Sequence, residues 1–257
     1  MKFNYHTHTQ HCRHAGGLPE DYAKEACLHN VKILGFSDHA PFPDTDYGFR
    51  MPFSELEEYI NECNEAKEKF KDKVQILKSL EIEWLPQYSD YYEKLLTDYK
   101  MDYLLLGEHF FQTHEKKIQN ITSIPDTKLA VEYAENCAEA MKTGYFKIFA
   151  HPDLFCINEP FSWNDDYEKA SDIIVEAAVK TNTILEFNAN GLRRGIKKYP
   201  DEERYQYPHK KFWNKAVSAG ITAVVGSDAH DPKCLWDGAV EESIAKLKSM
   251  NVRIYNE

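Results

Sequence analysis

Short apolar runs alternate along the chain with longer segments of helical periodicity. Seven runs are expected to form strands: Lys2–Tyr5, Ile33–Ser37, Val74–Ile82, Tyr103–Gly107, Ile148–Ala150, Thr183–Phe187 and Thr222–Gly226. The segments between them predict helices at Leu18–Asn30, Ser54–Phe70, Ser89–Tyr99, Asp126–Thr143, Asp166–Lys180, Pro208–Ala219 and Leu235–Met250. This alternation is typical of βα units around a parallel sheet. It predicts an α/β barrel near the (β/α)8 type but one unit short, with an open doubly wound sheet as the alternative.

Local signals mark several helix ends. Ser54 and Glu57 have the spacing of a capping box, and Asp126 is expected to cap the helix that ends before Gly144. No stretch approaches the roughly 18 apolar residues of a membrane span, and the first ten residues lack the apolar core of a secretory signal. We therefore expect a single cytoplasmic domain over residues 1–257.

The composition of the chain limits the kinds of molecule that it is expected to bind. The 42% of hydrophobic residues can form a substantial core, and the net charge of -11 disfavours non-specific binding to nucleic acid, which relies on a basic surface. The six cysteines are scattered without a CxxC pair, so a structural zinc site of the cysteine type is not expected. Cys12 lies among histidines, where a buried thiol is the better interpretation than a metal ligand.

Residues able to bind metals follow six of the seven expected strands. In a barrel these positions share the C-terminal face, where residues from different strands build an active site. A lone histidine after a strand is more often a loop residue, but alternate residues of an extended segment point the same way and can grip one ion. The set is His6, His8, His11 and His14; Asp38 and His39; Glu81 and Glu83; Glu108 and His109; His151 and Asp153; and Asp228 and His230.

The chemistry of these ligands indicates a hydrolase. Imidazole and carboxylate without thiolate suit Zn, Fe or Mn, and the set is too large for one ion. Neighbouring ions stabilise the attacking and leaving oxygens of a phosphoryl displacement and turn a bound water into the nucleophile. The chain has neither a G-x-S-x-G elbow nor a Walker loop. Only one of Glu81 and Glu83 is expected to reach the metals, and His29, His114 and His209 are expected to be ordinary surface residues.

A phosphate also needs cations besides the metals. The sixth expected strand has no metal ligand, but it leads into Arg193 and Arg194. Guanidinium groups offer a fork of donors that matches phosphate oxygens. The sequence therefore predicts a metal-dependent phosphoester hydrolase in which one or both arginines bind the phosphate.

The ordered motifs HTHTxxCxHA, SDHAP, Glu81, GEH, HPD and SDAH resemble those of the PHP (polymerase and histidinol phosphatase) superfamily. The segments SDHAPFP and EFNANGLRRG are most similar to its histidinol-phosphate phosphatase branch. The resemblance implies a distorted (β/α)7 barrel with three divalent ions. The first ion would be held by His6, His8, Glu81 and Asp228, the second by Glu81, His109 and His151, and the third by His14, His39 and His230.

The resemblance also implies an activity, the hydrolysis of L-histidinol phosphate in histidine biosynthesis through a metal-bound hydroxide. Asp228 and His230 would then act in catalysis with Arg193 and Arg194, while Asp38 would orient a ligand and lie with His39 near the substrate. Relatives often carry Lys or Arg after HPD, where this chain reads LFCINEP. The alternatives are another small phosphate monoester, nucleic-acid ends or a metal-binding module without turnover.

Overall fold

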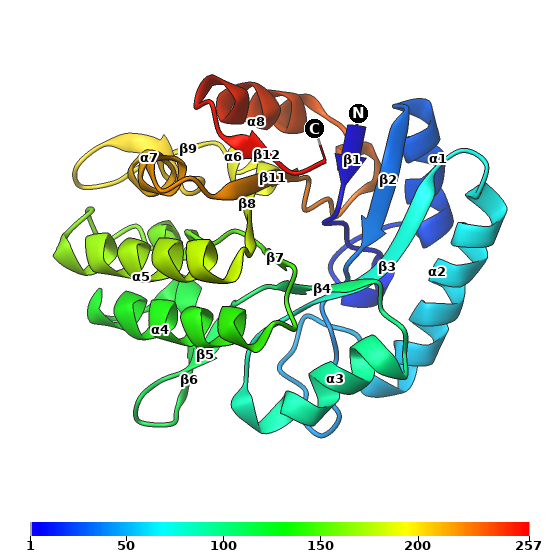
Figure 1. Ribbon diagram of the computed structural model, residues 1–257, viewed down its shortest axis with the longest axis horizontal. Helices are drawn as coiled ribbons and strands as arrows, with labels where there is room; N and C mark the ends of the chain where they lie inside the picture. The colour runs from blue at the N-terminus through cyan, green and yellow to red at the C-terminus, as the bar shows by residue number, and fades with distance from the viewer. Residues whose placement is uncertain (1, 257) are drawn as a thin grey trace.

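One curled parallel sheet forms the centre of the computed structural model, which describes residues 2–256 (Figure 1). Every neighbouring pair of its strands is parallel. In spatial order the strands are β1 (Lys2–Asn4), β2 (Val31–Phe36), β3 (Gln75–Ile82), β4 (Tyr103–Leu106), β7 (Ile148–Phe149), β8 (Ile184–Asn188), β11 (Thr222–Gly226) and β12 (Arg253–Ile254). The first seven lie at the predicted positions, so the distorted barrel predicted from the sequence is confirmed, and β12 is an eighth strand that the sequence did not reveal.

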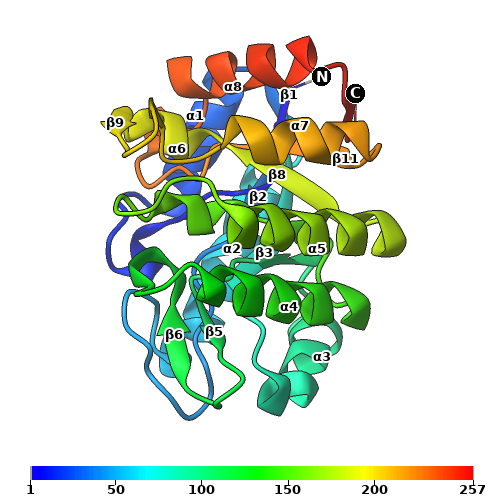
Figure 2. The same ribbon diagram turned by 90° about the vertical axis from the view of Figure 1, so that its left-hand side faces the viewer.

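Helices cover the outside of this sheet (Figures 1 and 2). The seven that were predicted are α1 (Pro19–Leu28), α2 (Leu56–Phe70), α3 (Ser89–Thr97), α4 (Lys128–Thr143), α5 (Asp165–Thr181), α7 (Lys210–Ser218) and α8 (Gly238–Ser249). The prediction of a capping box at Ser54 was wrong, because that residue lies in a 3-10 turn and α2 begins after Glu55 without a side-chain cap. The short helix α6 (Ala189–Arg193) and two hairpins, β5 (Phe110–Gln112) with β6 (Ile118–Asn120) and β9 (Ile196–Lys198) with β10 (Glu203–Tyr205), were not predicted.

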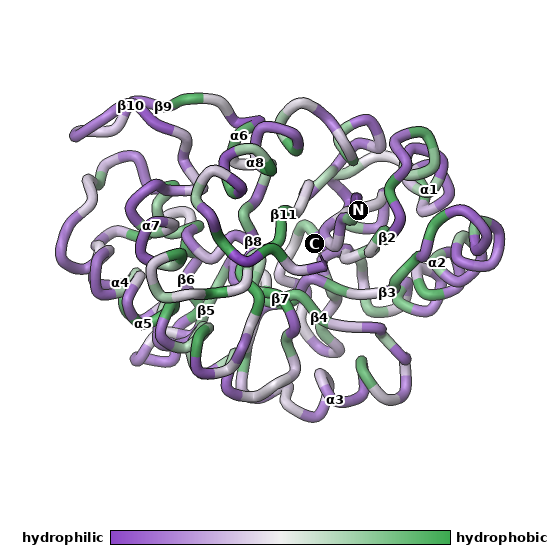
Figure 3. Tube along the Cα trace, turned by 45° about the horizontal axis from the view of Figure 1, so that its top comes forward, coloured by the Kyte–Doolittle hydropathy of each residue, from purple (hydrophilic) through white to green (hydrophobic). Residues whose placement is uncertain are grey.

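The strands alternate their side chains between two apolar layers. Leu105 and Val224 belong to a small cluster inside the curled sheet, whereas Leu104, Leu106 and Val225 belong to the larger cluster between the sheet and the helices. This is the period of two that a barrel strand requires, because successive side chains point to opposite faces. In Figure 3 hydrophobic positions gather along the central strands, and polar positions dominate the outer surface of the helices.

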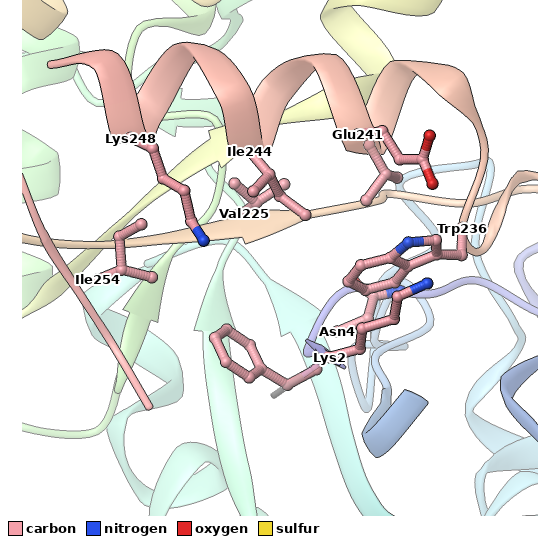
Figure 4. Close-up of a pocket in the computed structure, with 10 residues that line it drawn as sticks. Lys2, Asn4, Val225, Trp236, Glu241, Ile244, Lys248 and Ile254 are labelled. Atoms are coloured by element: carbon pink, nitrogen blue, oxygen red, sulfur yellow. The ribbon is translucent and has the colours of Figure 1, made fainter. Parts of the chain in front are cut away.

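The sheet is not closed into a complete barrel, because β1 and β12 are its two edges. Near the metal-facing end the gap is bridged: the Asn4 side chain pairs with Ser227, and the backbone N–H of His8 donates to the Ala229 carbonyl at 2.9 Å. Further along, α8 covers the gap above a cavity of about 370 Å³, in which Trp236 and Ile244 face the first strand (Figure 4). We call this line between β1 and β11 the seam.

Within residues 2–256 no helix has the length and apolar character needed to cross a membrane.

Candidate metal centre

The turn after β1 points two imidazoles toward the same carboxylates. His6 Nε2 and His8 Nε2 lie 2.9 Å apart, and each lies 3.3 Å from Glu81 Oε2 at the end of β3. Asp228 Oδ1, after β11, lies 3.7 Å from His6 Nε2 and 3.2 Å from His8 Nε2. Metal–ligand bonds of about 2.0–2.2 Å place neighbouring ligand atoms about 3.0–3.5 Å apart. These four donors therefore have the spacing of a shell around one ion.

The second oxygen of Glu81 faces a different pair of histidines. His151 Nε2 lies 2.8 Å from Glu81 Oε1, and His109 Nε2 lies 3.6 Å from the same atom. His151 and Asp228 have φ values of 35° and 46°, a left-handed conformation that residues other than glycine rarely adopt. Because its two oxygens face two groups of ligands, Glu81 has the geometry of a carboxylate that bridges two ions.

A third group lies nearer the outside. His14 Nε2 and His230 Nε2 face each other at 2.9 Å, and the ring of His39 stacks on His14 with 5.2 Å between ring centroids. His39 also connects this group to the others, because its Nδ1 lies 3.2 Å from Glu81 Oε2. All nine side chains expected to bind metal therefore meet at one end of the sheet.

The cluster fits cations better than hydrogen bonds. His14 Nδ1 donates to the Cys12 carbonyl and His230 Nδ1 to the Asp228 carbonyl, so when both rings are neutral their Nε2 lone pairs face each other. Buried Glu81 Oε2 accepts no hydrogen bond from the described residues, although three ring nitrogens lie within 3.3 Å. A cation among these atoms resolves both conflicts.

Burial and close charges shift the pKa values of the carboxylates and imidazoles in this cluster. Burial alone would raise the pKa of Glu81 and Asp228, but the surrounding histidines hold both pKa values well below the ordinary range. Burial lowers the pKa of His39 well below its usual value, and burial with the nearby His8 lowers that of His230 to about 3. Burial alone would lower the pKa of His6 and His8, but the carboxylates around them raise both pKa values well above the usual range. Metals bind ionised carboxylates and neutral imidazoles, so an ion bound here would displace the protons of these two rings.

Two buried carboxylates accept hydrogen bonds from the Nδ1 atoms of His6 and His109. Glu186 on β8 accepts a hydrogen bond from His6 Nδ1 at 2.7 Å, and Glu83 accepts one from His109 Nδ1 at 3.2 Å. Glu83 also binds both Nη atoms of buried Arg50 at 3.0 Å. Such partners fix the orientation of a metal-binding imidazole. The expectation that only one of Glu81 and Glu83 faces the metals agrees with this geometry, whereas Glu186 and Arg50 were missed.

The two arginines expected at the phosphate occupy different places. Arg193 points away from the cluster: its guanidinium binds Asp237 and the carbonyls of Ser227 and Cys234. Because these contacts occupy its donors, the expectation that it binds substrate or acts in catalysis is corrected. Arg194 lines a cavity of about 260 Å³ above the cluster, together with Asp228, His230 and His39.

Asp38 does not reach this cavity. It is fully buried and accepts hydrogen bonds from the backbone and hydroxyl of Thr9, so a direct contact with substrate is ruled out by its position. It lies close enough to His8 to shape the turn that carries this ligand, as the resemblance implied.

Other residues that follow strands turn elsewhere. Glu108 accepts a hydrogen bond from the Trp84 backbone, and Asp153 accepts one from the His209 backbone. His11 pairs with Glu62 at 3.0 Å, outside the cluster. His209 was expected at the surface, but it is 1% exposed, because its ring stacks on Trp163 and caps α7.

Of the remaining two histidines set aside from the sequence, His29 caps the C-terminal end of α1 and is half-buried, and His114 is exposed in the turn after β5. Cys12 is buried against the cluster, within 4.8 Å of ligand atoms on both His14 and His230.

A family model for the PHP domain matches residues 4–190 of this chain, which include seven of the nine expected ligands. The chain belongs to the PHP family. Asp228 and His230 lie beyond the matched segment, but the structure places them directly beside His8.

Several curated relatives of this PHP protein carry the name histidinol-phosphatase. A probable histidinol-phosphatase of Schizosaccharomyces pombe is 24% identical over 259 residues, covering 90% of this chain and 81% of the relative. The histidinol-phosphatase of Bacillus subtilis is 25% identical and covers 90% of this chain and 94% of the relative. A histidinol phosphate phosphatase of Lactococcus lactis, solved with zinc, L-histidinol and phosphate, has a TM-score of 0.74 and 18% identity over 98% of this chain and 95% of that chain.

Proposed function

We propose that this PHP protein hydrolyses L-histidinol phosphate to L-histidinol and phosphate. The observation that carries the proposal is the meeting of nine metal-binding side chains beneath a cavity that also contains the guanidinium of Arg194. Further support comes from the shared name of the curated relatives and from the zinc, histidinol and phosphate bound to the related Lactococcus protein. Histidine biosynthesis would be its pathway, in a single cytoplasmic domain as expected from the sequence.

Three divalent ions, with zinc among them, are part of this proposal. Divalent ions in such a site supply Lewis acidity toward phosphoryl oxygens and lower the pKa of water. His6, His8 and Asp228 would hold the first, His109 and His151 the second, and Glu81 would be shared between these two. His14, His39 and His230 would hold the third, because His14 Nε2 and His230 Nε2 face each other and the ring of His39 stacks on His14.

The chain's own side chains would then position and neutralise the phosphoryl group. Arg194 lines the cavity beside Tyr207, where its fork of donors can bind phosphate oxygens. Asp228 is held in place by the side-chain amides of Asn188 and Asn190, which donate to its Oδ2 at 3.2 and 3.1 Å. Asp228 and His230 are the proposed residues for proton transfer, because they combine ligand geometry with exposure to the cavity.

The test is release of phosphate from L-histidinol phosphate by protein reconstituted with zinc, manganese or iron. His8→Ala is expected to abolish turnover with the fold kept, whereas His29→Ala at the C-terminal end of α1, outside the cluster, serves as the matched control. Hydrolysis of other small monoesters but not of this one would refute the substrate and leave the phosphatase. Turnover of none of a monoester panel by metal-loaded protein would favour a metal-binding module, and trimming of single-stranded DNA ends would favour a nuclease.

A further inference from the structure

The cavity above the metal centre has an aromatic and apolar wall. Tyr47, Phe49 and Phe110 line it on the side of the segment after β2, and Leu154 and Ile157 line it on the side of the turn after β7. A substrate whose phosphoryl group sits among the metal ligands would place its leaving group against this wall. The side chains there favour a flat apolar group rather than a charged one.

Phe49 is the most unusual member of this wall. Its side chain is 77% exposed, more than any other large hydrophobic side chain that the structure describes. Its φ is 48°, a strained conformation for an aromatic residue, and it follows Gly48 at a φ of 75°. Its ring meets that of His14 edge-on, with centroids 5.8 Å apart. Folding therefore places a bare phenyl ring beside a proposed metal ligand at a cost in backbone strain.

The segment that carries Phe49 is anchored on both sides of this residue. Arg50 donates to the carbonyls of Gly48 and Ala40 at 3.1 and 2.9 Å. On the other side the ring of Tyr47 stacks against Phe110, with centroids 4.5 Å apart. These contacts hold the loop, while the Phe49 ring stays largely exposed apart from its edge-on contact with His14. A largely exposed ring on an anchored loop is suited to contact a ligand.

The same cavity offers no free carboxylate to an ammonium group. Asp228 is the one acidic side chain among the described residues that line it, and it belongs to the metal centre. The carboxylates of the nearby loop do not line the cavity: Asp44 accepts from the Tyr88 hydroxyl, and Asp46 accepts from the Gly48 backbone and pairs with Arg13. A substrate amine would therefore remain hydrated rather than gain a charged partner.

We propose that Phe49 is a specificity-determining residue and that the site takes phosphate monoesters whose alcohol carries an aromatic ring, with or without an amino group. The inference rests on the proposed phosphatase function and extends its substrates to ring-bearing esters that lack the ammonium of histidinol. The reaction is hydrolysis in each case: water adds to phosphorus, the P–O bond to the alcohol breaks, and the alcohol leaves with a proton from water. Phe49 packs on the ring and takes no part in the bond changes.

Three esters separate the contributions of ring and amine. L-Histidinol phosphate carries both, 3-(imidazol-4-yl)propyl phosphate keeps the ring without the amine, and 2-aminopropyl phosphate keeps the amine without the ring. The expected kcat/KM of the ring-only ester is within about tenfold of that of histidinol phosphate. The amine-only ester is expected to fall by about a hundredfold, the upper part of the range for a group removed from an apolar pocket.

Variants then test the residue itself. Phe49→Ala is expected to lower kcat/KM for both ring-bearing esters by about tenfold or more and to leave the amine-only ester within twofold. Phe49→Gly, which accepts the positive φ, is expected to behave like the alanine variant, and Phe49→Trp to retain activity. Phe53→Ala is the matched control, because Phe53 is a partly exposed phenylalanine of the same segment that packs on Tyr91 instead of lining the cavity.

Different results would overturn this inference and the proposed phosphatase function. A large loss for the ring-only ester alone would show that the amine is recognised and would overturn the inference while the phosphatase stands. Equal losses for all three esters in Phe49→Ala, at unchanged metal content and circular dichroism, would assign the residue to loop structure and also overturn it. Hydrolysis of none of the three by the metal-loaded parent protein would refute the proposed function itself.

Discussion

Removal of the Arg50 guanidinium tests how the wall of the cavity and the metal centre are coupled. Arg50 and Glu83 are 4% and 1% exposed and form a two-pronged ion pair, with both Nη···Oε distances at 3.0 Å. Burial alone would raise the pKa of Glu83, but Arg50 outweighs it and keeps this pKa below its ordinary value. The Arg50→Met variant therefore leaves a buried carboxylate charge whose remaining partner is His109.

The expected loss in the free energy of unfolding follows from the burial of this ion pair. Breaking a buried ion pair by removing one partner costs about 3–5 kcal/mol, because the other charge stays in a low dielectric. Removing both charges in Arg50→Met/Glu83→Gln avoids that penalty and loses mainly the hydrogen bonds of Arg50 to the carbonyls of Ala40 and Gly48, at about 1 kcal/mol each. The double variant is therefore expected to be more stable than either single variant by about 2 kcal/mol.

Urea unfolding followed by circular dichroism measures these differences, with every variant compared both metal-free and at one fixed metal concentration, since bound ions add to the free energy of unfolding. Separately, Glu83→Gln is expected to lower the affinity for one ion by about 10- to 100-fold, because Glu83 orients His109. The reasoning is refuted if the double variant is as unstable as the less stable single variant, or if Arg50→Met costs less than about 1 kcal/mol.

Three further predictions concern acid stability, metal binding and metal removal. Burial lowers the pKa of His209 to about 3, so the unfolded chain binds a proton at this residue below pH 6.5, where the folded chain does not. The free energy of unfolding should therefore fall by about 2 kcal/mol from pH 7 to pH 5 through this group. Urea titrations of His209→Gln should show a smaller dependence of this free energy on pH. A Cβ at Gly107 would lie 2.2 Å from Glu81 Cγ, so Gly107→Ala should lose bound metal in elemental analysis, whereas Gly16→Ala, with open space around it, should not. Removal of the ions with a chelator should lower the melting temperature in calorimetry, since each ion at 100 times its Kd adds about 2.7 kcal/mol; an unchanged melting temperature would contradict binding to the folded state.

The order of strands and the residues that follow them could be predicted because both depend on short-range pattern. Parallel strands deliver their C-terminal ends to one edge, so His6, Glu81 and Asp228 are brought together by topology alone. The partners behind them could not be assigned in this way. Arg50 meets Glu83 through a loop with no periodicity, and His209 is buried by stacking on Trp163, so neither contact has a signal in its own neighbourhood of the sequence.

Glu186 is a different kind of omission, because the sequence carried its signal. It lies two residues before Asn188 on the expected sixth strand, and alternate residues of a strand share a face. Since the Asn188 amide donates to Asp228 in the cluster, the same face brings Glu186 to His6. The sixth strand supplies no expected metal ligand, but two of its side chains hydrogen-bond to expected ligands, Glu186 to His6 and Asn188 to Asp228.

The seam gives the metal centre a structural role that ligand geometry alone does not. His6 and His8 follow β1 at one edge of the open sheet, whereas Asp228 follows β11 on the other side of the gap. The backbone link from His8 to Ala229 and the pairing of Asn4 with Ser227 hold the two sides together at this end. An ion bound by His6, His8 and Asp228 would join them again, through bonds that no strand pairing supplies. Residues expected to prepare the site for chemistry would therefore also help to close the barrel, beside the isolated β-bridge of Thr7 with Ala229.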